Sequence, residues 1–373
     1  MARVTLSRSK LRTNYKNLED LLEREDVSWG AVSKLFCGDM SFIGEVLDLG
    51  IPEVHDSRIA NLRAIKEQHP EVRTVYIKPA AHSAISDVVA WADVSFHSEM
   101  STLEELNGEA RRQGTTHEVV IMVEMGDLRE GVLPEDLLGF YRQALQFQHI
   151  RVSGIGTNLN CLSGVLPSEE ALDELVTLRD LLEKETGETL DLISAGTTVT
   201  LPLLESGDLP DGINHFRIGE ALYFGQNLVE EKTFDGWHDD VLELHADVIE
   251  LREKSMAPSG PMGTNPFGNV AEETDDRIAH RAIVDIGYLD VNPDFIVPSL
   301  PGIKIIDAAS DMLVLDLGEN PRDIAVGDTI TFRLEYMGAL HVMSSNYIGK
   351  EVVDTEATGA GIAACDMEIA VAS

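Results

Sequence analysis

A lysine at the end of an apolar run is the first residue whose surroundings indicate chemistry. In GAVSKLFCGD (residues 30–39), Lys34 follows a run that is typical of a buried strand, and Gly38 then breaks the run. An isolated lysine near a strand end usually extends its ammonium group into water. Here apolar residues stand on both sides (Val32, Leu35, Phe36), and burial would disfavour the charged amine and make it a nucleophile able to form a Schiff base.

Further polar residues follow later apolar runs. They are Arg129 in GDLREG, Asn158 and Cys161 in GTNLNC, Gly196, Thr197 and Thr198 in SAGTT, and Arg217 and Gly219 in FRIG. Small residues and hydroxyls, as in GTT and RIG, can hold a phosphate through backbone N–H groups, although each alone is more typical of an ordinary turn. A lysine together with a phosphate site suggests pyridoxal phosphate as the cofactor.

Eight short apolar runs separated by helical patterns would bring these residues together. The runs are 28–34, 53–58, 74–79, 93–98, 117–126, 150–159, 190–196 and 213–219. In two intervening segments, 98–114 and 167–187, Leu and Ala recur at helical spacing, with Ser98 and Ser168 as expected N-caps. Eight such units in about 220 residues predict a TIM (β/α)8 barrel, whose active site lies at the carboxyl ends of the strands. A doubly wound sheet is the alternative, but no glycine-rich phosphate loop follows the first run.

After about residue 235 the pattern changes to alternating apolar and polar residues. The runs 241–254, 280–291, 311–318 and 328–336 predict an antiparallel β domain, which a Pro-, Gly- and Asn-rich loop at 257–269 interrupts. We therefore expect a cofactor-binding barrel over residues 10–235 and a β domain over 236–373, with residues 1–9 associated with the latter.

Composition limits the possible partners and location. Among 373 residues, 29 are Lys or Arg and 65 are Asp or Glu, and the formal net charge of −36 would repel nucleic acids and anionic membranes. No apolar run approaches the roughly 20 residues of a membrane span, and the start lacks an apolar signal core, so we expect a cytoplasmic protein. Three cysteines suit neither a disulfide framework nor a zinc site. Acidity dispersed along the whole chain suggests a halophilic source.

Nine segments in this order resemble the alanine-racemase-like, fold-type III pyridoxal-phosphate enzymes, and among them most closely the ornithine racemase branch. The segments are AVSKLFCGD, HDSRIANL, HSEMSTLEELN, MVEMGDLREG, GIGTNLNC, SAGTT, HFRIGEALYFG, AASDMLVLDLG and VGDTITFRLEY, and the resemblance runs from about residue 2 to residue 352. It implies a TIM barrel followed by a β domain. It also implies an amino-acid racemase for ornithine or a related basic amino acid, working as a head-to-tail homodimer with shared active sites.

The resemblance assigns roles around the cofactor ring. Lys34 would bind the cofactor aldehyde as a Schiff base and act as one of two proton-transfer bases. Arg129 would approach the phenolic oxygen of the cofactor. Arg217 would face the pyridine nitrogen and leave it unprotonated, because a guanidinium does not give up its proton. The weaker electron sink would favour quick reprotonation of Cα over transamination.

Other matched positions concern the phosphate and the ring face. The phosphate-loop positions are Gly196, Thr197, Thr198, Gly219 and, through its backbone N–H, Glu220. Tyr347 would reach the phosphate from the β domain. Asn158 stands where alanine racemases have a histidine stacked against the ring, a departure shared with the ornithine branch.

The base for the second face of Cα is not evident. Alanine racemases use a tyrosine of a Tyr-Gly pair from the partner's β domain, whereas the matching pair here is Phe267-Gly268, and phenylalanine carries no proton. Cys161 is the first candidate, because a thiol near a cationic cofactor ionises readily. The other interpretation of Cys161 is a small buried apolar residue. Asp311, Tyr288 and a water molecule are alternatives for the base.

A cationic substrate side chain would need acidic acceptors. Asp39, Glu220 and Asp311 are candidates, and we select Asp311 as the substrate residue, although it equally suits a turn before the next strand.

Three other functions remain open. A basic amino-acid decarboxylase shares the two-domain plan, but its phosphate signature and Cys-based partner motif are missing. A D-amino-acid dehydratase or aldolase would need a metal, for which His341 and Cys365 are a loose pair, so we expect no metal. A non-catalytic pyridoxal-phosphate carrier would be a bare barrel.

Overall fold

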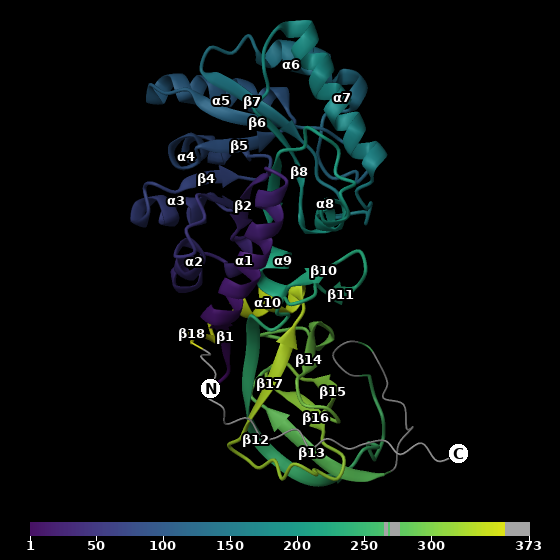
Figure 1. The fold of residues 1–373 in the computed structure, drawn as a ribbon. Helices are drawn as coiled ribbons and strands as arrows, with labels where there is room; N and C mark the ends of the chain where they lie inside the picture. Colours follow the sequence, from purple (N-terminus) through teal and green to yellow (C-terminus); the bar gives the residue numbers. More distant parts are fainter. Residues whose placement is uncertain (265–267, 269–276, 355–373) are drawn as a thin grey trace, which may run out of the picture.

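Eight parallel strands close into a barrel, which confirms the predicted fold of the first part of the chain (Figure 1). The computed structural model describes residues 1–264, 268 and 277–354. The barrel strands are β2 (Ser28–Val32), β3 (Glu53–Asp56), β4 (Arg73–Tyr76), β5 (Val94–His97), β6 (His117–Met122), β7 (Ile150–Gly156), β8 (Leu192–Gly196) and β9 (His215–Ile218). Each overlaps one of the eight predicted runs, and β2 closes the ring by pairing with β9.

One helix precedes the first barrel strand, the others follow barrel strands along the chain, and together they form the outer layer. They are α1 (Arg8–Arg24), α2 (Met40–Leu47), α3 (Ile59–Gln68), α4 (Ile85–Trp91), α5 (Met100–Gln113), α6 (Pro134–Ala144), α7 (Glu169–Thr186), α8 (Leu201–Ser206) and α9 (Glu220–Phe224). The predicted cap of α7 is confirmed, because the Ser168 hydroxyl accepts from the Ala171 N–H at 3.2 Å. The predicted cap at Ser98 is wrong. Helix α5 begins at Met100, and Glu99 takes the extended N-cap conformation without a side-chain cap bond.

The interior of the barrel has an apolar side and a polar side. The apolar side is a cluster formed by Val75, Val94, Phe96, Val120 and Met122, on β4, β5 and β6. Glu53 and His55 on β3, Ser194 on β8, and His215 and Arg217 on β9 form the polar side. The rings of His55 and Phe96 are in edge contact with centroids 6.4 Å apart, so the two sides meet. Because barrel interiors are ordinarily filled with branched apolar residues, these polar side chains need a separate explanation.

The second part of the chain is an eight-stranded sheet, and it confirms the predicted antiparallel β domain. Its strands are β1 (Arg3–Ser7), β12 (Leu242–Ser255), β13 (Ile278–Val284), β14 (Ile296–Pro298), β15 (Lys304–Ala308), β16 (Leu313–Asp316), β17 (Thr329–Leu334) and β18 (Gly349–Val353). The order is β14-β17-β12-β13-β16-β15, and β1 pairs antiparallel with β12 and parallel with β18. A small ribbon, β10 (Gln226–Asn227) and β11 (Lys232–Thr233), forms a separate two-stranded sheet.

One helix of the second part reaches the barrel. Helix α10 (Tyr336–Ser344) follows β17 and lies between the sheet and the barrel (Figure 1). It contacts η1 (Lys34–Phe36), the short 3-10 helix that begins with the candidate lysine. Side chains of α10 can therefore take part in a site at the barrel mouth. Within the described part of the chain, no helix has the length and apolar content to cross a bilayer.

Candidate active site

Lys34 stands where β2 ends and the chain turns toward α2. The preceding residue, Ser33, is buried and fixes the turn, because its N–H donates to the His55 carbonyl at 2.9 Å and its hydroxyl donates to Asp56 Oδ2 at 2.9 Å. Leu35 is buried behind the lysine, and Lys34 itself is half-buried. Its ammonium group makes no hydrogen bond or ion pair with any residue that the structure describes. The backbone at Lys34 is thus fixed, and the amine is available for reaction.

Glu220 and Tyr336 lie near the lysine. Glu220 is the first residue of α9, and its carboxylate has no hydrogen-bond partner among the described residues. Burial raises the pKa of Glu220 to about 7, although the ammonium of Lys34 lowers it. Burial raises the pKa of Tyr336 too, and the negative charges of Glu220 and Cys161 add to the rise. Tyr336 therefore keeps its proton at neutral pH.

Sequence reasoning missed Tyr336. It directly follows β17 in RLEYMG and is the first residue of α10, and its ring packs against Phe224 with centroids 6.4 Å apart. An aromatic residue in such a position is most often part of a core, so only the contact between α10 and η1 places it at the site. Tyr347, which was expected to reach the phosphate, is 77% exposed on the segment between α10 and β18, and its side chain makes no hydrogen bond to any residue that the structure describes.

Arg217 is a buried cation whose direct partners are all neutral. Its Nη1 donates to the Ser194 carbonyl at 2.7 Å and to the Ser194 hydroxyl at 2.5 Å. Its Nη2 donates to the Thr157 carbonyl at 2.7 Å and to Asn158 Oδ1 at 3.3 Å. Burial lowers the pKa of Arg217 to about 10, so it stays charged at neutral pH. Its Nε–H finds no acceptor among the described residues and is left for a ligand.

Asn158 connects Arg217 to an ion pair at the rim. The Asn158 amide donates to Glu130 Oε1 at 3.3 Å, and Glu130 binds Arg129 through both carboxylate oxygens. This ion pair engages Arg129, which the resemblance places at the phenolic oxygen of the cofactor. Arg129 nevertheless remains close to the site, since the charge of Arg129 helps to lower the pKa of Arg217.

Cys161 lies on the loop after β7, which is joined to the loop after β6. The Asp127 carboxylate accepts from the backbone N–H of Cys161 at 3.2 Å and from the N–H groups of Leu162 and Ser163 at 3.0 Å each. The residue is exposed, so the interpretation as a small buried apolar residue is wrong. A negative charge on its sulfur would raise the pKa of Arg129, Arg217 and Tyr336, which places the thiol among the mouth residues.

The ends of β8 and β9 also meet at the mouth. Thr197 and Thr200 cap the 3-10 helix η3 (Thr198–Thr200) reciprocally, and the Thr198 hydroxyl accepts from the Ala221 N–H at 3.1 Å. Thr198 thus joins η3 to the first turn of α9. A Cβ at Gly196 would lie 1.9 Å from the Phe216 ring, and one at Gly219 would lie 3.2 Å from Val32 Cβ. The close approach of these strand ends therefore requires Gly196, while Gly219 leaves little room for a larger residue.

Asp311 and Tyr288 lie together on the β domain. A Cβ on Gly287 would be 2.5 Å from the Asp311 backbone nitrogen, and both Asp311 and Tyr288 are exposed. The charges that act on the pKa of Tyr288 are those of Asp307 and Asp294, which belong to the same domain. Within one chain the structure does not group Asp311 with Lys34.

The sequence also pointed to Asp39, Phe267 and Cys365. Asp39 caps α2 by accepting from the N–H groups of Ser41 and Phe42, so its carboxylate is already engaged. Phe267 and Cys365 lie outside the described residues.

Comparison with known proteins extends these observations. The family model for the alanine racemase N-terminal domain matches residues 6–227. Ornithine racemase from Acetoanaerobium sticklandii is 33% identical over 352 residues, which cover 94% of this chain and 99% of that protein. Lysine racemase from Thermotoga maritima is 29% identical over 348 residues, which cover 93% of this chain and 97% of that protein.

A solved structure shows the same fold. Alanine racemase from Bartonella henselae with covalently bound pyridoxal phosphate matches with a TM-score of 0.70 at 15% identity, over 94% of this chain and 99% of that one. The family model covers well over half of the chain and includes the barrel with its mouth loops. The chain belongs to the alanine racemase family.

Proposed function

We propose that the protein is a pyridoxal-phosphate-dependent racemase that interconverts the L and D enantiomers of ornithine or a related basic amino acid. The observation that carries the proposal is the pairing of an unengaged lysine with a buried arginine whose Nε–H has no acceptor among the described residues. Lys34 and Arg217 stand at the same barrel mouth, because Lys34 follows β2, and β2 pairs with β9, which carries Arg217. The two curated relatives, an ornithine racemase and a lysine racemase, match nearly the whole chain.

The donor groups at the mouth fit pyridoxal phosphate. Its aldehyde needs an amine, which Lys34 supplies, and its ring nitrogen needs a donor, which Arg217 Nε supplies. The phosphate needs backbone N–H groups, which the start of α9 provides at Gly219 and Glu220, beside the hydroxyl of Thr198. When bound, the cofactor withdraws electrons from Cα of the amino acid and so acidifies the Cα–H bond.

The side chains of the protein then determine how the proton leaves Cα and returns to it. Lys34 removes or returns the proton on one face of Cα. Arg217 keeps the ring nitrogen unprotonated, because even a lowered pKa of about 10 leaves it charged at neutral pH. Electron withdrawal is therefore limited, which favours rapid return of the proton to Cα.

Inversion also needs a proton carrier on the opposite face. Cys161 is our candidate, since its thiol is exposed and lies among the charges of Arg129 and Arg217. Tyr336, which the structure adds, holds its proton at neutral pH, so little of it is in the ionised form that could accept the Cα proton.

Substrate selection rests on acidic groups. Glu220 presents a carboxylate next to Lys34 that has no hydrogen-bond partner in residues 1–264 and 277–354, and it suits a cationic substrate side chain. Asp311 and Tyr288 would join the site only from a second copy of the chain, so a head-to-tail homodimer is part of the proposal. A cytoplasmic location is also part of it, supported by the exposed free thiols of Cys37 and Cys161, which a reducing compartment maintains.

The test is loss of optical rotation when the protein is incubated with L-ornithine, with L-lysine, L-arginine, L-alanine and L-serine in parallel. Borohydride treatment with added cofactor should label Lys34. The Lys34→Arg variant should lose both activity and label, while Lys16→Arg, an exposed control on α1, should keep them. Release of CO₂ would instead support a decarboxylase, and binding without turnover would support a carrier.

A further inference from the structure

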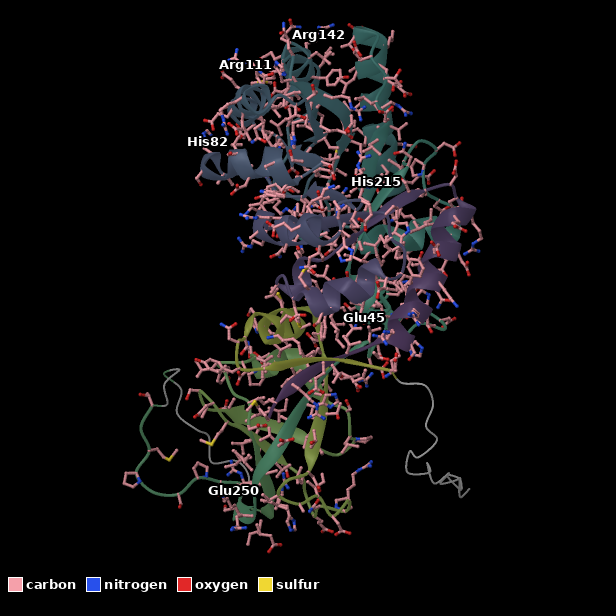
Figure 2. The ribbon with its side chains drawn as sticks, turned by 90° about the vertical axis from the view of Figure 1, so that its left-hand side faces the viewer. Glu45, His82, Arg111, Arg142, His215 and Glu250 are labelled. Carbon is pink, nitrogen blue, oxygen red and sulfur yellow. The ribbon has the colours of Figure 1, made fainter. Side chains whose placement is uncertain are left out.

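The polar side of the barrel interior contains a continuous chain of hydrogen bonds that begins at Arg217. Arg217 Nη1 contacts the Ser194 hydroxyl at 2.5 Å, and that hydroxyl contacts His215 Nδ1 at 2.7 Å. His215 Nε2 contacts Glu53 Oε1 at 2.9 Å. His215 lies within the barrel part of the molecule (Figure 2). Ser194, His215 and Arg217 are all less than 10% exposed.

The direction of each bond follows from the chemistry of its atoms. Burial would raise the pKa of Glu53, but the bonds from His215 and His55 outweigh burial and hold the pKa well below its usual range. Glu53 is then a carboxylate, and His215 Nε2 must carry a proton. The Arg217 guanidinium can only donate, so the Ser194 oxygen accepts from it and the Ser194 O–H is free to donate to His215 Nδ1.

The alternative of a metal ion held by Glu53, His55 and His215 does not fit this geometry. Nε2 of His55 lies 2.5 Å from Glu53 Oε1, and Nε2 of His215 lies 2.9 Å from the same oxygen, so hydrogen bonds occupy the positions of the ligands. The other oxygen of Glu53 pairs with Arg73 at 3.2 Å. A Cβ on Gly30 would lie 2.4 Å from His55 Nε2, so the backbone closes the remaining space.

The hydrogen bonds of Arg217 lead to two carboxylates, Glu130 and Glu53, and neither contacts the guanidinium directly. One residue, Asn158, separates it from Glu130, and two residues, Ser194 and His215, separate it from Glu53. A carboxylate in direct contact would bind the guanidinium more strongly and compete with the ligand for its orientation. The intervening residues fix the guanidinium plane and still stabilise its charge.

We propose that Ser194, His215 and Glu53 are positioning residues that hold Arg217 with its Nε–H directed at the cofactor ring nitrogen. The proposal rests on the proposed function for its ligand. Its chemical consequence concerns the fate of the proton taken from Cα. A displaced guanidinium lets water protonate the ring nitrogen, which strengthens electron withdrawal. The proton would then be returned more often to C4′ of the cofactor, and cleavage of the C=N bond by water would release the oxo acid and pyridoxamine phosphate instead of the enantiomer.

The barrel supplies matched controls for both ends of the chain of bonds. Ser95 is as deeply buried as Ser194 and bonds to two histidines, His97 and His117, at 2.7 Å each, but it does not contact Arg217. Glu118 pairs with Arg73 at 2.6 Å, as Glu53 does at 3.2 Å, but it does not contact His215. Ser194→Ala and Glu53→Gln are therefore compared with Ser95→Ala and Glu118→Gln.

The first measurement is made on the holoenzyme with L-ornithine. The ratio of pyridoxamine phosphate formed to racemisation turnovers should rise at least fivefold in Ser194→Ala and Glu53→Gln, with a shifted visible absorption band. kcat should fall more than KM rises, and Ser194→Thr, which keeps the hydroxyl, should restore the ratio. In Ser95→Ala and Glu118→Gln the ratio should stay within twofold. An unchanged ratio in the first pair, or an equal rise in both pairs, overturns the proposal.

The second measurement needs no cofactor and separates failure of this proposal from failure of the proposed function. A double-mutant cycle in urea unfolding combines Glu53→Gln with Arg217→Lys, and the coupling should change the unfolding constant at least fivefold. Glu118→Gln with Arg217→Lys should show coupling below twofold. If Glu53 and Arg217 are coupled in a protein that binds no pyridoxal phosphate, the proposed function is refuted and the chain of hydrogen bonds is supported. Equal coupling in both cycles refutes the chain itself.

Discussion

Glu220→Gln should make the protein more stable and its substrate recognition poorer. Burial raises the pKa of Glu220 from 4.5 to about 7, so its ionised form is disfavoured in the folded state. A rise of about 2.5 corresponds to about 3 kcal/mol at about 1.4 kcal/mol per pKa unit, and partial exposure reduces the expected effect to about 1–2 kcal/mol. Glutamine has the same shape and no charge to bury.

The sign of the pH dependence follows from the raised pKa. Below the unfolded value of 4.5 the carboxyl is neutral in both states and costs no stability. As the pH rises toward about 7, the unfolded chain releases the proton first, and the wild-type protein loses stability. The gain from Glu220→Gln should therefore be near zero at about pH 4 and full at about pH 8.

The assay is urea unfolding of the cofactor-free protein at both pH values. Glu205→Gln, which removes an exposed carboxylate on α8, is the control and should show no such difference. With cofactor, KM for L-ornithine should rise about tenfold in Glu220→Gln, as expected for loss of a hydrogen bond between charged groups, and KM for L-alanine should not change. Equal stability changes at the two pH values would refute the burial argument. Equal KM changes for both substrates would refute the role in recognition.

Three further results are expected. Cys161→Ala should abolish racemisation, measured by optical rotation, and leave the visible absorbance of the bound cofactor intact, and full activity would remove the thiol from the mechanism. Gly196→Ala should lower the free energy of unfolding by about 3 kcal/mol or more, because its Cβ would lie 1.9 Å from the Phe216 ring. In the same assay Gly139→Ala, on an open face of α6, should stabilise by about 0.5–1 kcal/mol, and equal effects would contradict the packing argument. The melting temperature should rise as KCl approaches molar levels, since salt screens the net charge of −36, and a flat or falling curve would exclude salt adaptation.

The barrel could be predicted because its signals are local. Each of the eight strands is a short apolar run between helical patterns, and parallel βα units of this number have few ways to close. Lys34 could be singled out for the same reason, since the end of its strand is visible within ten residues of sequence. Cap positions were less certain, and Ser98 shows why, because a helix can begin one residue later on any extended backbone.

Residues that depend on long-range contacts could not be predicted. Glu53, Ser194 and His215 each look like an ordinary polar residue of a strand, and only closure of the barrel brings them into one chain of hydrogen bonds. Tyr336 and Tyr347 show the same limit. Both are aromatic residues of the β domain, and their sequence surroundings do not distinguish them. The contact of α10 with η1 places Tyr336 near the site, whereas Tyr347 is exposed.

The pairing of β1 with β12 and β18 bears on how the protein is made. β1 precedes the barrel in the sequence, but it belongs to a sheet that also needs strands from after the barrel, since Arg3 lies beside Gly349. The barrel can fold during translation, while β1 waits for partners from the other end of the chain. Fragments that carry only one of the two parts should therefore expose an unpaired strand edge and aggregate when expressed alone.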